Sequence, residues 1–338
     1  PWLTPDAARL DKQNGKEWID ALDISPLGKA GIYIQLMADN GQDPARQSYL
    51  GNLTQVKGGG LEKYWTDSEV YRCKGGNQQL AMKLAEAVGQ DRLILGLPVT
   101  DVVQKGNNVV VTCKDGRTLE CDDVVLSVPP PVWKKINFNP GIPAMLAPQM
   151  GSNVKYLAAV KTRFWKDKKL APDSMTDGDV SMTWEGTDNQ EPDDGAALNC
   201  FSGGRASEAC RAYPDAASRD KAYAEQLEKL YPGFGENFVQ SRFMNWPSDP
   251  WVMASYSFPA PGEVTKVGPM LHKGLGKLHF AGEHTSYKFI GYMEGGLNSG
   301  ATVARRLAAR DGLLKETPAT RPVTPPAPAT RRELQPAR

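Results

Sequence analysis

Histidine and paired cysteine are scarce in this sequence, and both absences bear on metal chemistry. Only three histidines occur among 338 residues, which argues against a site built from several imidazole ligands. The five cysteines are odd in number and no two form a C-x-x-C pair, so neither a zinc site nor a redox dithiol is indicated. Their scatter favours reduced thiols and leaves room for one disulfide. We therefore expect no metal ion.

Long apolar runs and an excess of charge of one sign are also missing. No apolar run reaches the roughly 18 residues that span a bilayer, and no secretory signal peptide is visible. The formal net charge is +1, and no basic stripe suited to a phosphate backbone stands out. The sequence thus predicts a soluble protein with neither nucleic acid nor a membrane among its partners. It leaves open whether the compartment is cytoplasmic or periplasmic.

One stretch, residues 278–307, has the pattern strand, glycine turn, helix. Leu278–Phe280 is apolar enough for a buried strand, and Ala281-Gly282-Glu283 supplies a tight turn with an acid. Glycines let the backbone approach a ligand closely, and the N-terminus of a helix offers free N–H groups to an electron-rich group. The stretch therefore predicts a ligand-binding turn. The helix that follows has one apolar face, made of Leu297, Ala301, Ala304, Leu307 and Ala308.

The same residues resemble the C-terminal signature of the flavin-containing amine oxidases, which include monoamine, polyamine and L-amino acid oxidases. In that family a strand ending in Phe-Ala-Gly-acid is followed by Gly-Tyr-Met-Glu-Gly, and Gly282-Glu283 and residues 291–295 stand in register with both parts. The resemblance implies FAD as the cofactor. It also implies an α/β fold of two domains, in which a glutathione-reductase-like FAD domain is interleaved with a substrate domain of mixed sheet and helices.

The segments before residue 90 are predicted to be mainly helical. Thr4-Pro5-Asp6 and Ser25-Pro26 are helix starts, and Gly58-Gly59-Gly60 interrupts the helical pattern. Those glycines lack the G-x-G-x-x-G spacing, so we expect a simple loop rather than a phosphate site. Residues 71–90 then give a loop and a helix with Asn77 as its cap. The apolar stripe of that helix holds Leu80, Leu84 and Val88.

Strands are predicted between residues 92 and 128. Two hairpin signals, Gly106-Asn107-Asn108 and Asp115-Gly116, separate segments that alternate or run apolar. These segments are residues 92–97, 99–104, 109–113 and 124–128. By the resemblance this is the family's β-meander, in which Val99 sets its backbone against the adenine end of FAD.

The pattern from residue 132 to residue 250 is mixed. Residues 151–155 are expected to lead into a strand that runs through Val160, a second apolar segment lies around residues 196–201, and a helix is expected over 217–231. The acidic, glycine-containing segment 173–194 is expected to be a surface loop.

For a flavin to oxidise an amine, the protein mainly has to provide a pocket that fits the substrate and excludes water. The protein has to hold the carbon that bears the amine near the flavin ring and to favour the uncharged amine, because an ammonium has no lone pair. Aromatic walls lower the pKa of an amine through desolvation.

Tyr256 and Tyr292 are our candidates for these walls. Tyr292 matches the family's motif, and Tyr256 follows Trp246 by ten residues, a spacing at which monoamine oxidases carry a tryptophan and a tyrosine beside the flavin. The ordinary alternative is that both are core tyrosines.

Lys155 is the third catalytic candidate. It ends Gly151-Ser152-x-x-Lys155, which matches a family motif whose lysine hydrogen-bonds a water at flavin N5. A cation there stabilises negative charge that develops as oxygen reacts. The alternative is a solvated surface lysine.

The resemblance also assigns contacts to the cofactor. Gly282 and Glu283 meet the ribityl-pyrophosphate region through backbone and water, and Met293 presents its backbone N–H to the carbonyl side of the flavin. Ser255 stands where monoamine oxidases carry the cysteine that binds FAD covalently, and a hydroxyl cannot form that thioether, so FAD is predicted to be non-covalent. The predicted cofactor contacts are Val99, Trp246, Gly282, Glu283, Gly291, Tyr292 and Met293.

A dinucleotide-binding unit is missing. The family begins with a βαβ unit bearing G-x-G-x-x-G, followed some 20 residues on by an acid for the ribose, and this sequence shows neither. The resemblance covers residues 1 to about 310, the C-terminal two-thirds of a complete member. We expect one subunit of a processed enzyme, a truncated product or an incomplete chain. A separate N-terminal chain that completes the FAD site is one of the expected partners, and without such a segment FAD should bind poorly.

The expected organisation alternates between two spatial units. Its parts are 1–70, helical substrate-domain part; 71–135, FAD-domain part with the β-meander; 136–250, substrate-domain sheet and helices; 251–312, C-terminal FAD-domain part; and 313–338, a disordered proline-rich tail.

Two functions stay open. The first is oxidative deamination of a primary amine or L-amino acid with O2 as acceptor, giving H2O2 and an imine that hydrolyses to an aldehyde or keto acid and ammonia. Paired tyrosines favour amines, whereas the sequence Gly-Glu-His-Thr at 282–285 is closer to amino acid oxidases, which hold the carboxylate with an arginine that we cannot assign. The second is a catalytically inactive fragment or subunit that acts as a binding or interaction module.

Overall fold

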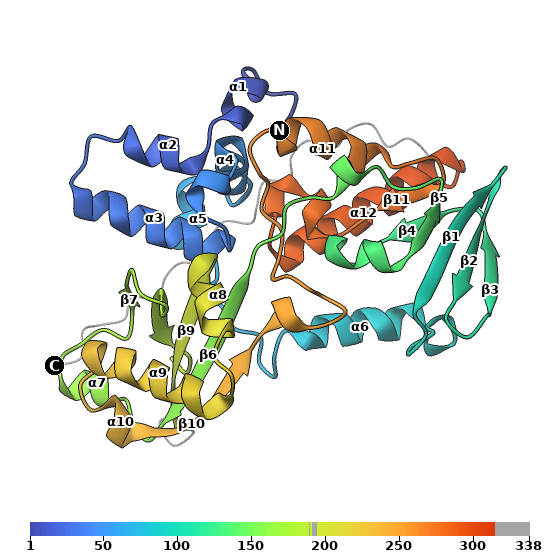
Figure 1. Cartoon of the computed structure of the whole chain (residues 1–338). Helices are drawn as coiled ribbons and strands as arrows, with labels where there is room; N and C mark the ends of the chain where they lie inside the picture. The colour runs from blue at the N-terminus through green and yellow to red at the C-terminus, as the bar shows by residue number, and fades with distance from the viewer. Residues whose placement is uncertain (189, 191–194, 315–338) are drawn as a thin grey trace, which may run out of the picture.

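The computed structural model describes residues 1–188, 190 and 195–314, which form two regions (Figure 1). One region is built on a sheet of five strands, with the helices of the N-terminal segment beside it. The other holds two smaller sheets and a long helix near the end of the described chain. All five cysteine thiols are free, and none of the described helices combines the length and the apolar character that crossing a bilayer demands. The predicted tail lies outside the described residues from position 315 onward, and the predicted domain boundaries stay a prediction.

The N-terminal segment is helical, as predicted. Ser25 caps a 15-residue helix, because its Oγ accepts a hydrogen bond from the Gly28 N–H at 3.1 Å while Pro26 fills the first helical position. Asp6 precedes the first helix, but its side chain makes no capping bond. The predicted glycine break is where the fourth helix ends. The helices are α1 (Ala7–Lys12), α2 (Gly15–Asp20), α3 (Pro26–Asn40), α4 (Tyr49–Gly58) and α5 (Glu62–Thr66), with a 3-10 turn η1 (Pro44–Arg46) before α4.

The larger sheet is antiparallel throughout, in the order β10-β6-β9-β8-β7. The predicted strand through Val160 is confirmed, and the apolar segment around residues 196–201 also forms a strand. The prediction of a surface loop over 173–194 is wrong, since two short strands lie within it. Each strand is too short for its alternation of apolar and polar residues to stand out among the flanking acids and glycines. The strands are β6 (Asn153–Val160), β7 (Ser174–Met175), β8 (Met182–Glu185), β9 (Ala196–Gly203) and β10 (Phe238–Met244).

The two faces of this sheet have different roles. Val154 and Tyr156 on β6 point into a core that α9 (Ala216–Leu230) covers, and the Tyr156 ring stacks on Tyr223 with centroids 3.9 Å apart. Leu227 is fully buried there, which stabilises the fold by about 1.5–3 kcal/mol. Because side chains alternate along a strand, Lys155 between these two core residues emerges on the other face. Three shorter helices complete this region: α7 (Phe164–Asp167), α8 (Arg205–Arg211) and α10 (Phe234–Asn237).

The second region contains the predicted strand, turn and helix. β11 (Leu278–Phe280) is wholly buried and pairs in parallel with β4 (Val124–Leu126), and Gly282 follows at φ 132°. The hairpin signals at Gly106 and Gly116 join β1 (Val99–Lys105), β2 (Asn108–Cys113) and β3 (Thr118–Cys121), and β5 (Asn137–Asn139) lies parallel to β1. A strand over 92–97 was predicted wrongly: Ile94 and Leu95 are exposed and find no partner strand. The remaining elements are α6 (Gln78–Val88), α11 (Glu263–Lys273), α12 (Met293–Arg310), and the 3-10 turns η2 (Gln90–Arg92), η3 (Pro130–Lys135), η4 (Ala144–Leu146), η6 (Trp246–Ser248), η7 (Glu283–Thr285) and η8 (Tyr287–Phe289).

Two helices of this region leave their predicted apolar faces open. α6 forms where predicted, but Asn77 makes no side-chain cap bond, and the stripe of Leu80, Leu84 and Val88 is exposed. α12 buries a different face from the one predicted, made of Gly295, Ser299 and Val303, while Leu297 is exposed. Apolar periodicity identifies a helix, but the neighbours in space decide which face is covered.

Candidate functional site

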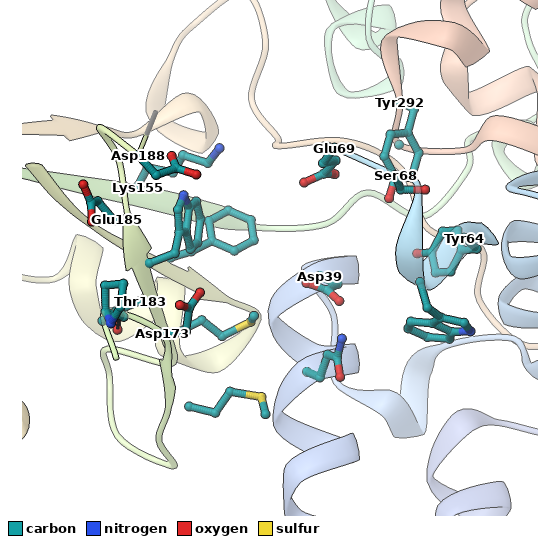
Figure 2. A pocket seen from close by; sticks show the side chains of 18 of the residues that line it. Asp39, Tyr64, Ser68, Glu69, Lys155, Asp173, Thr183, Glu185, Asp188 and Tyr292 are labelled. Atoms are coloured by element: carbon teal, nitrogen blue, oxygen red, sulfur yellow. Dashed lines mark hydrogen bonds between the residues drawn. The ribbon is translucent and has the colours of Figure 1, made fainter. Parts of the chain in front are cut away.

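A cavity of about 980 Å³ lies where the two regions meet (Figure 2). Its volume is in the range of pockets that hold small-molecule ligands and cofactors. The walls come from the C-terminal end of α3, from α5 and the chain after it, from the open face of the larger sheet, and from the segments around Tyr256 and Tyr292. Segments far apart in sequence therefore converge on one space.

The two predicted aromatic walls share this cavity. Tyr256 donates a hydrogen bond from its hydroxyl to the backbone oxygen of Asp39, and its ring lies against Gly291. A Cβ at Gly291 would come within 3.3 Å of that ring, and φ there is +81°, so both space and backbone require glycine. Tyr64 lies near Tyr292 on the same wall (Figure 2). Burial raises the pKa of Tyr256 and of Tyr292, which keeps both phenols neutral.

Glu283 joins the two segments that carry these tyrosines. Its carboxylate accepts hydrogen bonds from the Ser257 N–H at 2.9 Å, the Ser257 hydroxyl at 2.8 Å and the Gly291 N–H at 2.6 Å. Ser257 follows Tyr256 and Gly291 precedes Tyr292, so one side chain fixes the backbone beside both rings. Burial raises the pKa of Glu283, and the bonds from Gly291 and Ser257 act against that rise. The side chain is thus committed within the protein, and its backbone is what remains for a ligand.

Lys155 enters the cavity from the opposite side. Figure 2 shows it beside Glu185 and Asp188 on the sheet wall, whereas Tyr292 and Tyr64 lie across the space. The ammonium lies 5.5 Å from the centroid of the Trp184 ring and 5.3 Å from that of Phe201. Burial lowers the pKa of Lys155.

The other predicted cofactor contacts are dispersed. Met293 and Gly291 line the cavity, whereas Trp246, Val99, Gly282 and Glu283 do not. Trp246 is half-exposed in η6. Val99 begins β1 in the meander. Gly282 donates its N–H to the Ser299 hydroxyl at 2.8 Å, behind the turn.

Ser255, at the position of the family's cysteine, is also committed within the protein. Its hydroxyl donates a 2.7 Å hydrogen bond to the Asn153 Oδ1. The hydroxyl proton of Ser255 is therefore already engaged by the protein.

The residues present suit the ring end of a flavin. The glycine at 291 keeps the space beside the Tyr256 ring free, and α12 begins at Met293 on the same wall. The first N–H groups of a helix have no partner within it, so this end offers donors to the electron-rich edge of a ring. The described residues suit only the ring end of FAD, because no described loop has the G-x-G-x-x-G spacing that binds a pyrophosphate.

Several residues of the cavity escaped sequence analysis. Asp39, Tyr64, Glu69, Arg72 and Trp184 all line it. Asp39 ends a helix and Glu69 follows one, positions at which acids commonly lie on the surface, so no local pattern set them apart. Asp39 is part-buried, and burial together with the nearby carboxylate of Glu69 raises its pKa to about 6.

Comparison with protein families and curated proteins gives a consistent result. The family model described as flavin containing amine oxidoreductase matches residues 2–308. Amine oxidase [flavin-containing] A of Equus caballus is 26% identical over 336 residues, covering 94% of this chain and 62% of its own length. Amine oxidase [flavin-containing] B of Canis lupus familiaris is 27% identical over 336 residues, with 94% and 63% covered. The chain thus spans about three fifths of the length of these relatives.

Solved structures show the same fold. Cyclohexylamine oxidase from Brevibacterium oxydans IH-35A has a TM-score of 0.78 at 24% identity, covering 92% of this chain and 71% of that one. Wild-type putrescine oxidase bound to putrescine has a TM-score of 0.79 at 22% identity, with the same coverage. The fold class predicted from the sequence is confirmed.

The substitution Glu283→Gln tests whether Glu283 connects the two segments that carry Tyr256 and Tyr292. The amide keeps the shape but turns one acceptor into a donor, which leaves at least one of the three N–H or O–H groups unpaired. We expect the free energy of unfolding to fall by about 1–3 kcal/mol. Urea denaturation measures the change. Glu294→Gln, the same substitution at an exposed site on α12, should have an effect within about 0.5 kcal/mol. Equal midpoints for the two variants would contradict the role.

The raised pKa of Asp39 predicts that this residue lowers the free energy of unfolding by an amount that depends on pH. Because the folded-state pKa of about 6 exceeds the ordinary 3.8, the folded protein binds a proton more readily than the unfolded chain between these values. The contribution of this group to stability is therefore present below pH 3.8 and lost as pH rises through about 6. Asp39→Asn should stabilise the fold by about 1–3 kcal/mol at pH 7.5 and by much less at pH 4.5. Asp23→Asn, at an exposed position, serves as the control; a pH-independent difference for Asp39→Asn would refute the argument.

Proposed function

Because this chain belongs to the family of flavin-containing amine oxidoreductases, we propose that it carries the substrate-binding part of an FAD-dependent oxidase of primary amines or L-amino acids. The observation that supports this most is the convergence of Tyr256 and Tyr292 on one cavity that Lys155 also lines. When bound, FAD accepts a hydride from the carbon that bears the amine and passes two electrons to O2, which yields H2O2. The imine takes up water to give an aldehyde or keto acid and ammonia.

The chain's own residues prepare the amine for this reaction. Tyr256 and Tyr292 present their rings to the cavity, and the Tyr256 hydroxyl is engaged by the backbone of Asp39. Such walls exclude water and lower the pKa of an amine placed between them, which favours the uncharged form that can be oxidised. Lys155 supplies a positive charge on the far wall, where it stabilises negative charge as oxygen is reduced.

A further segment is proposed to complete the FAD site. Among the described strands β11 pairs with β4 alone in its sheet, and a sheet of two strands is marginal by itself. The open stripe of α6 and the exposed Val125 of β4 belong to the same region. We propose that a G-x-G-x-x-G βαβ unit, on this polypeptide or a separate chain, covers this surface and binds the pyrophosphate.

The same open surface favours the second candidate, a non-catalytic subunit that binds a partner through this face. Amine-dependent release of H2O2 distinguishes the two. The protein should be produced with a βαβ unit, loaded with FAD and given a panel of primary amines and L-amino acids. Release of peroxide in air, together with bleaching of the flavin by the amine in the absence of O2, supports the oxidase. A protein that holds FAD and yields no peroxide from any of them supports the binding role.

Lys155→Met tests the proposed role in oxygen reduction. Removal of the charge should slow reoxidation of the reduced flavin by at least tenfold, while reduction by amine under anaerobic conditions changes less, because the charge acts on the oxygen step. Stopped-flow absorbance separates the two half-reactions. Lys166→Met, on the exposed face of α7, is the control. Reoxidation at the wild-type rate would remove Lys155 from the mechanism.

The position of Ser255 predicts that FAD is released by denaturation. Precipitation of the loaded protein with trichloroacetic acid should leave a colourless pellet and put the yellow flavin in the supernatant. The Ser255 hydroxyl is no thiol and is held by Asn153, so no thioether can form. A pellet that stays yellow would contradict the prediction.

A further inference from the structure

The proposed reaction requires that the substrate lose a proton before it is oxidised. An alkyl amine reaches the cavity as an ammonium, since the pKa of such a group in water is about 10.4. The walls of the aromatic slot, the space between the rings of Tyr256 and Tyr292, lower that pKa but take up no proton themselves. Burial raises the pKa of both phenols, so both are already protonated. Because the slot excludes water, the proton acceptor has to be another group of the protein.

Asp39 lies at the edge of the aromatic slot. Its backbone oxygen accepts the hydrogen bond of the Tyr256 hydroxyl, and its side chain is short, so the carboxylate stays near that end of the ring. Figure 2 shows the carboxylate at the end of α3, directed into the cavity. Its negative charge contributes to the raised pKa of three phenols, those of Tyr64, Tyr256 and Tyr292. This carboxylate is therefore within electrostatic reach of both walls of the slot.

Three features increase the affinity of Asp39 for a proton. Burial disfavours its charged form, and the carboxylate of Glu69 adds repulsion. Asp39 also lies in the last turn of α3, where the partial negative charge of a helix C-terminus disfavours a further negative charge. A hydrogen bond from Gln35 acts in the opposite direction. The resulting pKa of about 6 leaves Asp39 ionised at pH 7.5 and makes it a better proton acceptor than an ordinary aspartate.

The other charged groups of the cavity belong to the sheet wall or to the chain that faces it. They are Arg72, Lys155, Asp173, Glu185 and Asp188. Arg72 pairs with Asp188, and Glu185 pairs with Arg163. Lys155 lies over two aromatic rings, and its charge repels an incoming ammonium. The carboxylates that raise the pKa of Tyr256 and Tyr292 are instead Asp39 and Glu69.

From this arrangement we infer that Asp39 is the base that takes the proton from the substrate ammonium at the edge of the aromatic slot. One N–H bond of the ammonium breaks and one O–H bond forms on the Asp39 carboxylate, which leaves a neutral amine and a neutral carboxylic acid. The acid returns its proton to water after the product leaves. The inference rests on the proposed function and adds a catalytic residue to it.

The surroundings of Asp39 and Glu69 favour this transfer. The ammonium and the carboxylate both lose their charge, which suits a site where water is scarce. Protonation of Asp39 also removes its repulsion from Glu69, whose backbone is held at φ +59°, a conformation that residues other than glycine rarely adopt. Strained backbone and a carboxylate with a raised pKa are both typical of functional sites.

The pH dependence of flavin reduction tests this role. Anaerobic stopped-flow absorbance with butylamine gives the rate constant of reduction divided by the dissociation constant of the amine. For the wild type this ratio should rise through about pH 6, where Asp39 ionises, and then stay level up to pH 10. For Asp39→Asn it should be at least tenfold lower at pH 7.5, rise about tenfold for each pH unit, and come within about threefold of the wild type at pH 10, because the solution then supplies the free amine. Asp23→Asn, at an exposed position, should match the wild type throughout.

Two further comparisons distinguish a base from a negative charge that merely attracts the ammonium. Glu69→Gln should move the rise seen in the wild type to lower pH, since the charge of Glu69 raises the pKa of Asp39. With 2,2,2-trifluoroethylamine, which is largely uncharged at pH 7.5, Asp39→Asn should react within about threefold of the wild type. A profile of Asp39→Asn that runs parallel to that of the wild type, or an equal loss with both amines, would overturn the inference and leave the proposed function standing.

A measurement without turnover separates failure of this inference from failure of the proposed function. In tert-butylamine the carbon that bears the nitrogen has no hydrogen, so this amine binds without being oxidised. Added to the FAD-loaded protein at pH 8, it should produce the C=O stretching band of a protonated carboxyl group in an infrared difference spectrum. A band that Asp39→Asn removes supports the inference, whether or not any amine yields peroxide. Absence of the band, or a band that persists in Asp39→Asn, overturns it.

Discussion

The three hydrogen bonds on the Glu283 carboxylate are the contact on which this site depends. The turn after a buried strand supplies the acid, and two segments that arrive from different parts of the chain supply the donors. Each donor is adjacent in sequence to a tyrosine of the cavity. The backbone around Tyr256 is also paired with Gly151, but the bonds of Glu283 are the ones that connect it to the segment of Tyr292. A charge-assisted hydrogen bond is roughly twice as strong as a neutral one, so a carboxylate is well suited to connect two segments.

The cavity is divided into unlike walls. The sheet contributes Lys155 by simple alternation, since its two neighbours on β6 belong to the core. The helical segment contributes Asp39 at its C-terminal end, and the turn segments contribute the tyrosines. The lining thus comes from separate elements, and the bond from the Tyr256 hydroxyl to the backbone of Asp39 connects two of them. This arrangement suits a family in which one fold serves several amines.

Sequence alone predicted the parts of this arrangement that are encoded locally. Strand β11, the turn at Gly282 and the following helix come from a contiguous pattern, and the motif around Tyr292 identified both the family and one aromatic wall. Lys155 followed from a short motif and from alternation along its strand.

The parts that depend on tertiary neighbours could not be found in this way. The partners of Glu283 lie 26 and 8 residues away, and no periodicity relates them. Asp39 and Glu69 became notable only when the structure placed both of them in the cavity. The apolar stripes of α6 and α12 were visible in the sequence, but which faces are covered depends on what packs against them. The strands within 173–194 were missed because two to four residues carry too little pattern.

The central claim is that the reacting nitrogen lies between the rings of Tyr256 and Tyr292. A crystal structure of the protein loaded with FAD and soaked with a slowly reacting amine tests it most directly. We expect density for the amine bounded by both phenol rings, with Glu283 still bonded to Ser257 and Gly291. Amine density elsewhere in the cavity, or rings that separate when the ligand binds, would contradict it.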